Sequence, residues 1–131
     1  MKLVSLFAAV GIALASQAAA QTFRAENRVT VTPQSGGLFS VPTNTSFGAR
    51  GAWCAAADYA IDVLGVSDGN RLYVRNPQSS NSGPVVFGIS PGSTTPAAVS
   101  GISSALRLAG SNLSINHAYQ YCHDTNLINS R

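Results

Sequence analysis

Residues 50–64 read RGAWCAAADYAIDVL, and their apolar side chains repeat with the period of an α-helix. The apolar positions fall at i, i+4, i+7, i+8 and i+11 and make one stripe: Trp53, Ala57, Ala60, Ile61 and Leu64. Thr45 or Ser46 can cap the start of this helix, and Gly65 stands where a C-cap glycine belongs. The spacing therefore predicts a helix that turns one face, including the indole of Trp53, into a core.

Two pairs of β-type segments flank this helix. Residues 28–32 (RVTVT) alternate polar and apolar, and after a PQSGG turn the short apolar run 38–41 can pair back as a hairpin. Residues 71–75 (RLYVR) alternate strictly, and 84–90 (PVVFGIS) follow after a polar loop. These two segments predict a second, long-looped hairpin.

The last third of the chain predicts a further strand and a helix. Residues 97–109 are ambiguous, because Val99, Ile102, Leu106 and Ala109 have helical spacing whereas 104–108 alternate. We expect a strand over 102–108, because a lone two-stranded hairpin is marginal in water. Residues 110–112 (GSN) indicate a turn, and 114–123 indicate a short helix with its apolar side chains at i, i+3, i+4 and i+7: Ile115, Ala118, Tyr119 and Cys122.

The two cysteines fall on the two predicted helices. Cys54 lies at the edge of the first apolar stripe, and Cys122 lies on the second. An even pair in an exported protein is most simply one disulfide, which would close a loop of nearly 70 residues. We therefore expect an α+β fold over 21–131, a small antiparallel sheet with one face packed on two helices and one disulfide.

The first twenty residues have the pattern of a cleaved secretory signal. Lys2 gives a positive start, residues 3–15 are apolar, and small residues precede a cleavage point after Ala20, with Ala18 as an alternative. Lys2 is the only lysine, so the remaining domain has seven arginines against five acids, a net charge of +2. We expect an exported protein, periplasmic or secreted, without a transmembrane helix in its mature part.

One strand predicts a binding surface. Because side chains alternate along a strand, Arg71, Tyr73 and Arg75 should share the face opposite to Leu72 and Val74. If 102–108 is also a strand, Arg107 joins them. Arginine forks fit phosphate and carboxylate, and tyrosine offers a flat contact. This face suits an anionic envelope polymer or an acidic protein, although it also fits the solvated side of a one-sided sheet.

Other chemistry has weaker support in the sequence. The acids Asp58 and Asp62, one helical turn apart, suit either a solvated helix face or acid–base work in a desolvated pocket. His117 and His123 are six residues apart and would not converge on a metal, so we expect no metal site. Nucleotide-binding and serine-nucleophile motifs are absent, no cofactor is indicated, and a charge of +2 argues against nucleic acid.

The segment 53–60 (WCAAADYA), the leader and the C-terminal cysteine together resemble small exported proteins of alphaproteobacteria. That resemblance implies export and a disulfide, and no activity. The sequence thus predicts an exported binding or interaction module. Two alternatives stay open: a small periplasmic hydrolase using His117 with a nearby carboxylate, and a structural envelope protein that associates through a sheet edge.

Overall fold

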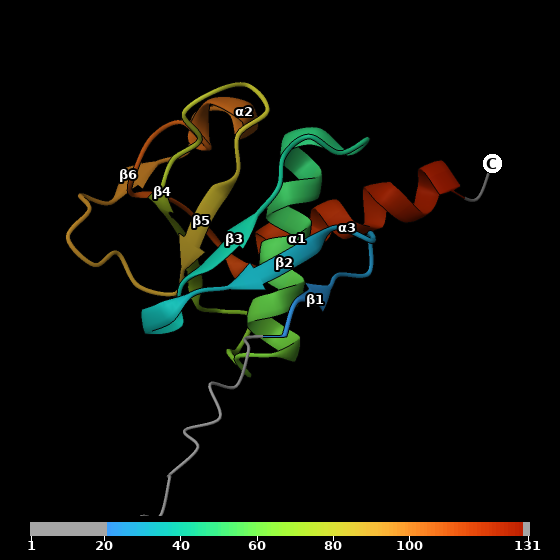
Figure 1. The fold of residues 1–131 in the computed structure, drawn as a ribbon, viewed down its shortest axis with the longest axis horizontal. Helices are drawn as coiled ribbons and strands as arrows, with labels where there is room; N and C mark the ends of the chain where they lie inside the picture. The colour runs from blue at the N-terminus through green and yellow to red at the C-terminus, as the bar shows by residue number, and fades with distance from the viewer. Residues whose placement is uncertain (1–20, 130–131) are drawn as a thin grey trace, which may run out of the picture.

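A computed structural model describes residues 21–129 as one α+β domain (Figure 1). The expected leader, 1–20, lies outside the described residues. Two long helices are α1 (Gly48–Asp62) and α3 (Ile115–Asn129), with one short helix and a single 3-10 turn, α2 (Ile102–Ala105) and η1 (Ser35–Gly37). The strands are β1 (Phe23–Arg24), β2 (Thr30–Pro33), β3 (Phe39–Val41), β4 (Arg71–Asn76), β5 (Val85–Gly88), β6 (Ala97–Ala98) and β7 (Ser111–Ser114).

The strands form one sheet in the order β1-β2-β3-β5-β4-β7-β6. Every neighbouring pair is antiparallel except β6 and β7, which are parallel. Both expected hairpins are confirmed, β2 with β3 and β4 with β5, the latter with a register shift between Val74 and Asn76. The two edge strands, β1 and β6, are two residues each, which leaves little backbone for edge-to-edge pairing.

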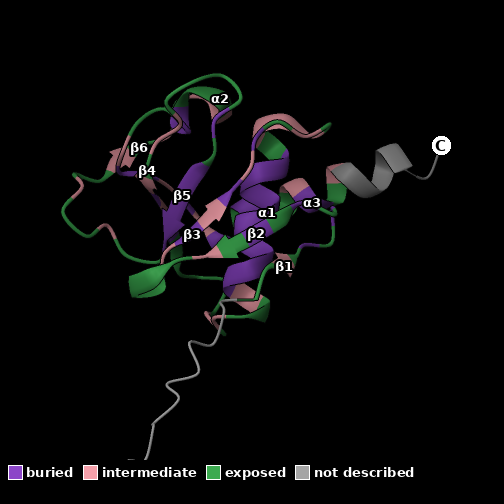
Figure 2. Ribbon diagram, in the orientation of Figure 1, coloured by how far each residue is buried: buried purple, intermediate pink, exposed green. Residues whose placement is uncertain are grey.

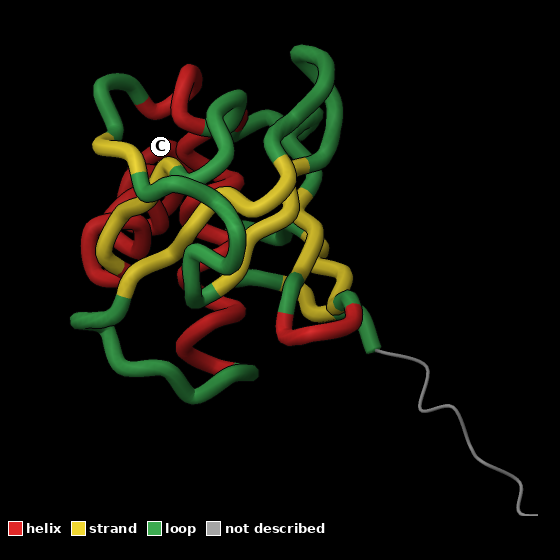
Figure 3. Tube along the Cα trace, turned by 90° about the vertical axis from the view of Figure 1, so that its left-hand side faces the viewer, coloured by secondary structure: helices red, strands yellow, loops and turns green. Residues whose placement is uncertain are grey.

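The core lies between one sheet face and the pair α1 and α3, as expected from the sequence (Figure 2). In the view of Figure 3 the strands lie in front of these helices. The ring of Trp53 meets Phe87 of β5 edge-on at 5.0 Å, and Phe39 of β3 lies 4.5 Å from the Tyr59 ring. Small side chains let α1 approach both the sheet and α3, and all are fully buried: Ala52, Ala55, Ala56, Ala57, Ala60 and Ala118.

The disulfide between Cys54 and Cys122 is confirmed. It joins α1 to α3 with 5.0 Å between the Cα atoms, and both cysteines are fully buried. The two residues are 68 positions apart, so the bond closes more than half of the chain into a loop. Its position inside the helix–helix contact makes it part of the core as well as a covalent link.

The prediction of a strand over 102–108 is wrong. Residues 102–105 form α2, in which the Ala105 N–H donates to the Gly101 carbonyl and the Ser104 hydroxyl donates to the same oxygen. Leu106 is buried, but Leu108, which a strand would turn to the same face as Leu106, is 53% exposed. The free edge of β4 is taken instead by β7, at the residues expected to form a turn and a helix start.

Of the two caps predicted for α1, the side-chain cap at its start is wrong and the glycine after its end is confirmed. Neither Thr45 nor Ser46 caps α1 by its side chain; Phe47 is the N-cap, and the Gly48 N–H donates to the Thr45 carbonyl. That backbone turn replaces the side-chain cap. Gly65 does follow the helix with a φ of +66°, a left-handed conformation that glycine adopts without strain.

Replacing both cysteines by alanine should lower the free energy of unfolding by about 4 kcal/mol, the loop-closure entropy expected for a loop of this size. Urea denaturation of the oxidised protein and of Cys54→Ala/Cys122→Ala measures the difference. A thiol assay on the protein isolated without reductant is the control and should find no free thiol. An unchanged free energy would show that the bond adds nothing to the helix packing.

Candidate functional site

The outer face of β4 carries the side chains that the alternation predicted. Leu72 and Val74 are fully buried against the helices, whereas Arg71 is exposed and Tyr73 and Arg75 are half-buried. β4 lies between β5 and β7, so this face sits near the middle of the sheet. Arg71, Tyr73 and Arg75 therefore form one surface, here called the β4 face.

Neighbouring groups orient both arginines of the β4 face. The Arg71 Nε donates to the Asn112 Oδ1 of β7 at 2.5 Å, and the Arg75 Nη1 donates to the Ser90 carbonyl at 3.3 Å. The Arg75 guanidinium also packs on the loop after β5 so closely that a Cβ on Gly92 would overlap it. Each guanidinium uses neutral acceptors, which leaves its charge uncompensated while its direction is fixed.

Arg107 does not join the β4 face. The segment that carries it is the turn after α2 rather than a strand, so no alternation places it beside Arg71 or Arg75. Its guanidinium donates instead to the Asn81 side chain in the β4–β5 loop. Its predicted place in the sheet surface is therefore wrong.

Most of the acidic side chains line a single hollow. Four of the five acids of the chain line one hollow of about 510 Å³ beside the second half of α1: Glu26, Asp58, Asp62 and Asp68. Its other walls are Ile61, Val66, Ser67, Asn116 and Tyr119. Among residues 21–129 the structure records one ion pair, Arg50 with Asp124 at 3.1 Å. The β4 arginines thus have no carboxylate partner within the described part of the chain.

Asp58 is the buried member of this acidic hollow. Asp58 is only 5% exposed, and its Oδ2 accepts a hydrogen bond from the Glu26 backbone N–H at 2.8 Å. Burial above all, together with the neighbouring Asp62 carboxyl, raises the pKa of Asp58 from 3.8 to about 6, against the lowering effect of the Glu26 N–H. Asp58 is therefore the half of the i, i+4 pair that lies in a desolvated setting.

Glu26 and Tyr119 complete the hollow, and the sequence did not single them out for it. The Tyr119 hydroxyl donates to the Glu26 Oε2 at 2.6 Å, and this bond, with burial, raises the pKa of Tyr119 to about 12. The two residues are 93 positions apart. Only the spacing of Asp58 and Asp62 pointed to this region, and nothing in the sequence links it to the N-terminal segment.

His117 lies outside this arrangement. Its Nε2 is 3.3 Å from the Tyr121 hydroxyl on the exposed side of α3. The hollow around Asp58 is lined by the preceding residue, Asn116, and not by His117. Among the described side chains, His117 forms no hydrogen bond with a carboxylate, so the histidine–acid arrangement of the hydrolase alternative is not assembled here.

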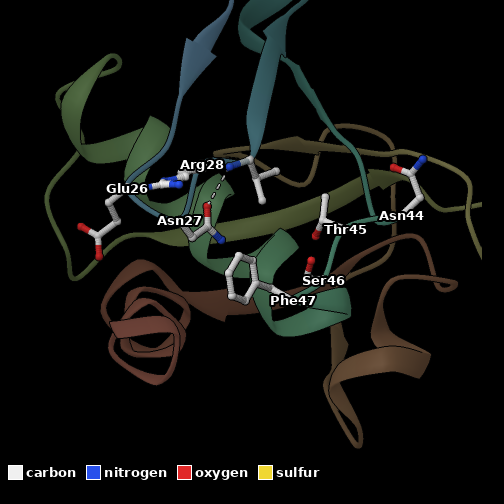
Figure 4. A pocket seen from close by; sticks show the side chains of 8 residues that line it. Glu26, Asn27, Arg28, Asn44, Thr45, Ser46 and Phe47 are labelled. Carbon is white, nitrogen blue, oxygen red and sulfur yellow. Dashed lines mark hydrogen bonds between the residues drawn. The ribbon is translucent and has the colours of Figure 1, made fainter. Parts of the chain in front are cut away.

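A second hollow, of about 640 Å³, opens at the start of α1 between residues 26–29 and 44–47 (Figure 4). Asn27 and Phe47 lie on one side of it, and Thr45 and Ser46 on the other. Asn27 is held rigidly, since its Nδ2 donates to the Gly51 carbonyl and its Oδ1 accepts the Val29 N–H. Arg28 has a φ of +67°, an uncommon conformation for a residue with a side chain.

No family model, curated protein or solved structure matches this chain. Within residues 21–129, neither long helix has the length and apolar character that crossing a bilayer requires. The β4 face and the acidic hollow are therefore the features of the molecule that bear on its function.

Stability should fall as the pH rises through the titration of Asp58. A carboxyl whose pKa is higher in the folded state than in the unfolded chain stabilises the fold fully below pH 3.8, and this contribution is lost as the pH passes about 6. A shift from 3.8 to about 6 corresponds to about 3 kcal/mol. Asp58→Asn, which keeps an acceptor for the Glu26 N–H, should flatten this dependence.

Urea denaturation of the oxidised protein at intervals from pH 4 to pH 8 measures the effect. Asp68→Asn, an exposed acid of the same hollow, is the matched control and should leave the slope in place. If Asp58→Asn showed the same slope as the unaltered protein, another group would be responsible.

Proposed function

We propose that this chain is an exported binding module that recognises an anionic polymer of the cell envelope through the β4 face. The observation that carries the proposal is the separation of charge. Arg71 and Arg75 have only neutral partners among the described residues, while four of the five acids line the hollow beside α1. A cationic surface with no internal counter-charge attracts anions.

The chemistry of the β4 face fits repeated anionic groups. A guanidinium binds phosphate or carboxylate through two parallel hydrogen bonds, and each arginine keeps donors beyond those used within the fold. Tyr73 lies between the two arginines along the strand and offers a flat, partly apolar surface. Neither of the two large hollows is lined by these residues, which favours an extended ligand over a small molecule.

Export is part of the same proposal. The leader-like residues 1–20 support it, and so does the Cys54–Cys122 bond, since disulfides persist in oxidising compartments and are rare in the cytosol. An exported protein meets envelope polymers rich in phosphate and carboxylate. The location and the cationic face therefore agree with each other.

Removing the two arginines should abolish most of the binding. Arg71→Ala/Arg75→Ala should weaken the dissociation constant for an anionic envelope polymer by tenfold or more, because a hydrogen bond to a charged group contributes about 1.5–3 kcal/mol. Lipopolysaccharide and anionic peptidoglycan fragments are the test ligands, with heparin as a generic polyanion. Isothermal titration calorimetry at low and moderate salt provides the affinities.

Arg24→Ala/Arg50→Ala is the charge-matched control, because both residues are exposed and lie off β4. It should keep most of the affinity at moderate salt. Equal losses in the two double variants would mean unspecific attraction and would overturn the β4 face as the site. Binding only to an acidic protein, with no polymer bound, would replace the polymer as the ligand.

A further inference from the structure

Three metal-ligating side chains converge beside the acidic hollow. The Sγ atoms of Cys54 and Cys122 and a carboxylate oxygen of Glu26 all lie within 4.8 Å of one another. They come from three separate segments: α1, α3 and the stretch between β1 and β2. The fold thus brings two sulfurs and one carboxylate to a single point.

With the disulfide formed, the two sulfurs are bonded to each other and cannot act as thiolate ligands. We propose that reduction of Cys54–Cys122 turns this point into a binding site for a thiophilic divalent cation of the zinc class. The ligands are the two thiolates and the Glu26 carboxylate, and a fourth position remains for water. This inference is independent of the binding proposed for the β4 face.

The redox step balances with a dithiol or phosphine reductant. A dithiol gives two electrons and two protons to the Cys54–Cys122 bond and becomes a disulfide itself, and the protein gains two thiols. Cation binding then releases the two thiol protons to solvent, since the thiolate is the ligand. A disulfide oxidant takes the two electrons back and is itself reduced to thiols, the Cys54–Cys122 bond re-forms and the cation is expelled, so the redox state decides whether the site exists.

The carboxylate of Glu26 lies near enough to both sulfurs to serve with them as a zinc ligand. Zinc binds thiolate sulfur at about 2.3 Å and carboxylate oxygen at about 2.0–2.2 Å, so tetrahedral ligand atoms lie roughly 3.3–3.8 Å apart. The Glu26 carboxylate oxygen already lies within 4.8 Å of both sulfurs, and the sulfurs, bonded to each other in the oxidised protein, move apart to this spacing after reduction.

Neighbouring groups supply the outer contacts and the entrance. The Tyr119 hydroxyl donates to the Glu26 carboxylate at 2.6 Å and orients it, as outer partners of metal ligands do. Glu26 and Tyr119 also line the acidic hollow, whereas both cysteines are fully buried. A cation would therefore enter from the hollow, where Asp62 and Asp68 add to the negative potential.

Cobalt titration of the reduced chain tests the proposal. The protein is reduced and refolded anaerobically with a phosphine, a thiol assay verifies two free thiols, and Co²⁺ is added. We expect one equivalent to produce thiolate-to-cobalt absorption in the near ultraviolet and the visible bands of tetrahedral cobalt, both removed by Zn²⁺. The oxidised protein should give neither signal.

Variants locate the third ligand. Glu26→Ala should weaken the cobalt dissociation constant tenfold or more, whereas Asp124→Asn, which removes a carboxylate paired with Arg50 on the exposed surface, should leave it unchanged. Circular dichroism of each variant verifies that the helices are present. Equal affinity in Glu26→Ala, or cobalt bound without a thiolate band, would overturn the assignment.

The proposal can still be tested if the chain unfolds on reduction. If the reduced chain unfolds and Zn²⁺ restores its helical circular dichroism, binding is coupled to folding, as in small zinc domains, and the proposal stands. If the reduced chain stays unfolded with Zn²⁺, or folds and binds no cobalt, the proposal is wrong and the Cys54–Cys122 pair acts as a structural link alone.

Discussion

The close contact between α1 and α3, joined at Cys54–Cys122, is the constraint on which the rest of the molecule depends. A run of buried alanines lets the two backbones approach, and the sheet packs across both helices. The N-terminal segment is then fastened to the pair at two points, by the Glu26 N–H on Asp58 of α1 and by the Glu26 carboxylate on Tyr119 of α3. The acidic hollow exists because these three segments meet there.

The alternation along β4 divides the charge of the domain. Leu72 and Val74 close the core, and the same strand turns Arg71 and Arg75 to its outer face. The acids instead lie beside the second half of α1, where the N-terminal segment partly buries Asp58. The β4 face can therefore attract anions, and the acidic hollow can attract cations. This division links the fold to the proposed binding function and to the proposed metal site.

Much of the fold could be predicted from local patterns, because the periodicity of 50–64 and the alternation of 71–75 report directly on a buried face. The β4 face follows from the same alternation. Residues 102–108 could not be assigned from local sequence, since their spacing suits both a helix and a strand. The outcome depends on a distant segment, because β7 pairs with the edge of β4. The acidic hollow could not be predicted from the sequence either. The i, i+4 spacing of Asp58 and Asp62 is visible, but the burial of Asp58 depends on Glu26, 32 residues away.

The Cys54–Cys122 bond fastens α3 to α1, and Glu26 ties the N-terminal segment to both helices, whereas β3, β4 and β5 are also held by their hydrogen bonds to one another. Amide hydrogen exchange, followed residue by residue in the oxidised protein and in Cys54→Ala/Cys122→Ala, tests this arrangement most directly. In the variant, the amides of α3 and of residues 25–29 should exchange through an opening of lower free energy than those of β3, β4 and β5. Loss of protection by the same free energy in all of these elements would contradict it, and so would unchanged protection of α3.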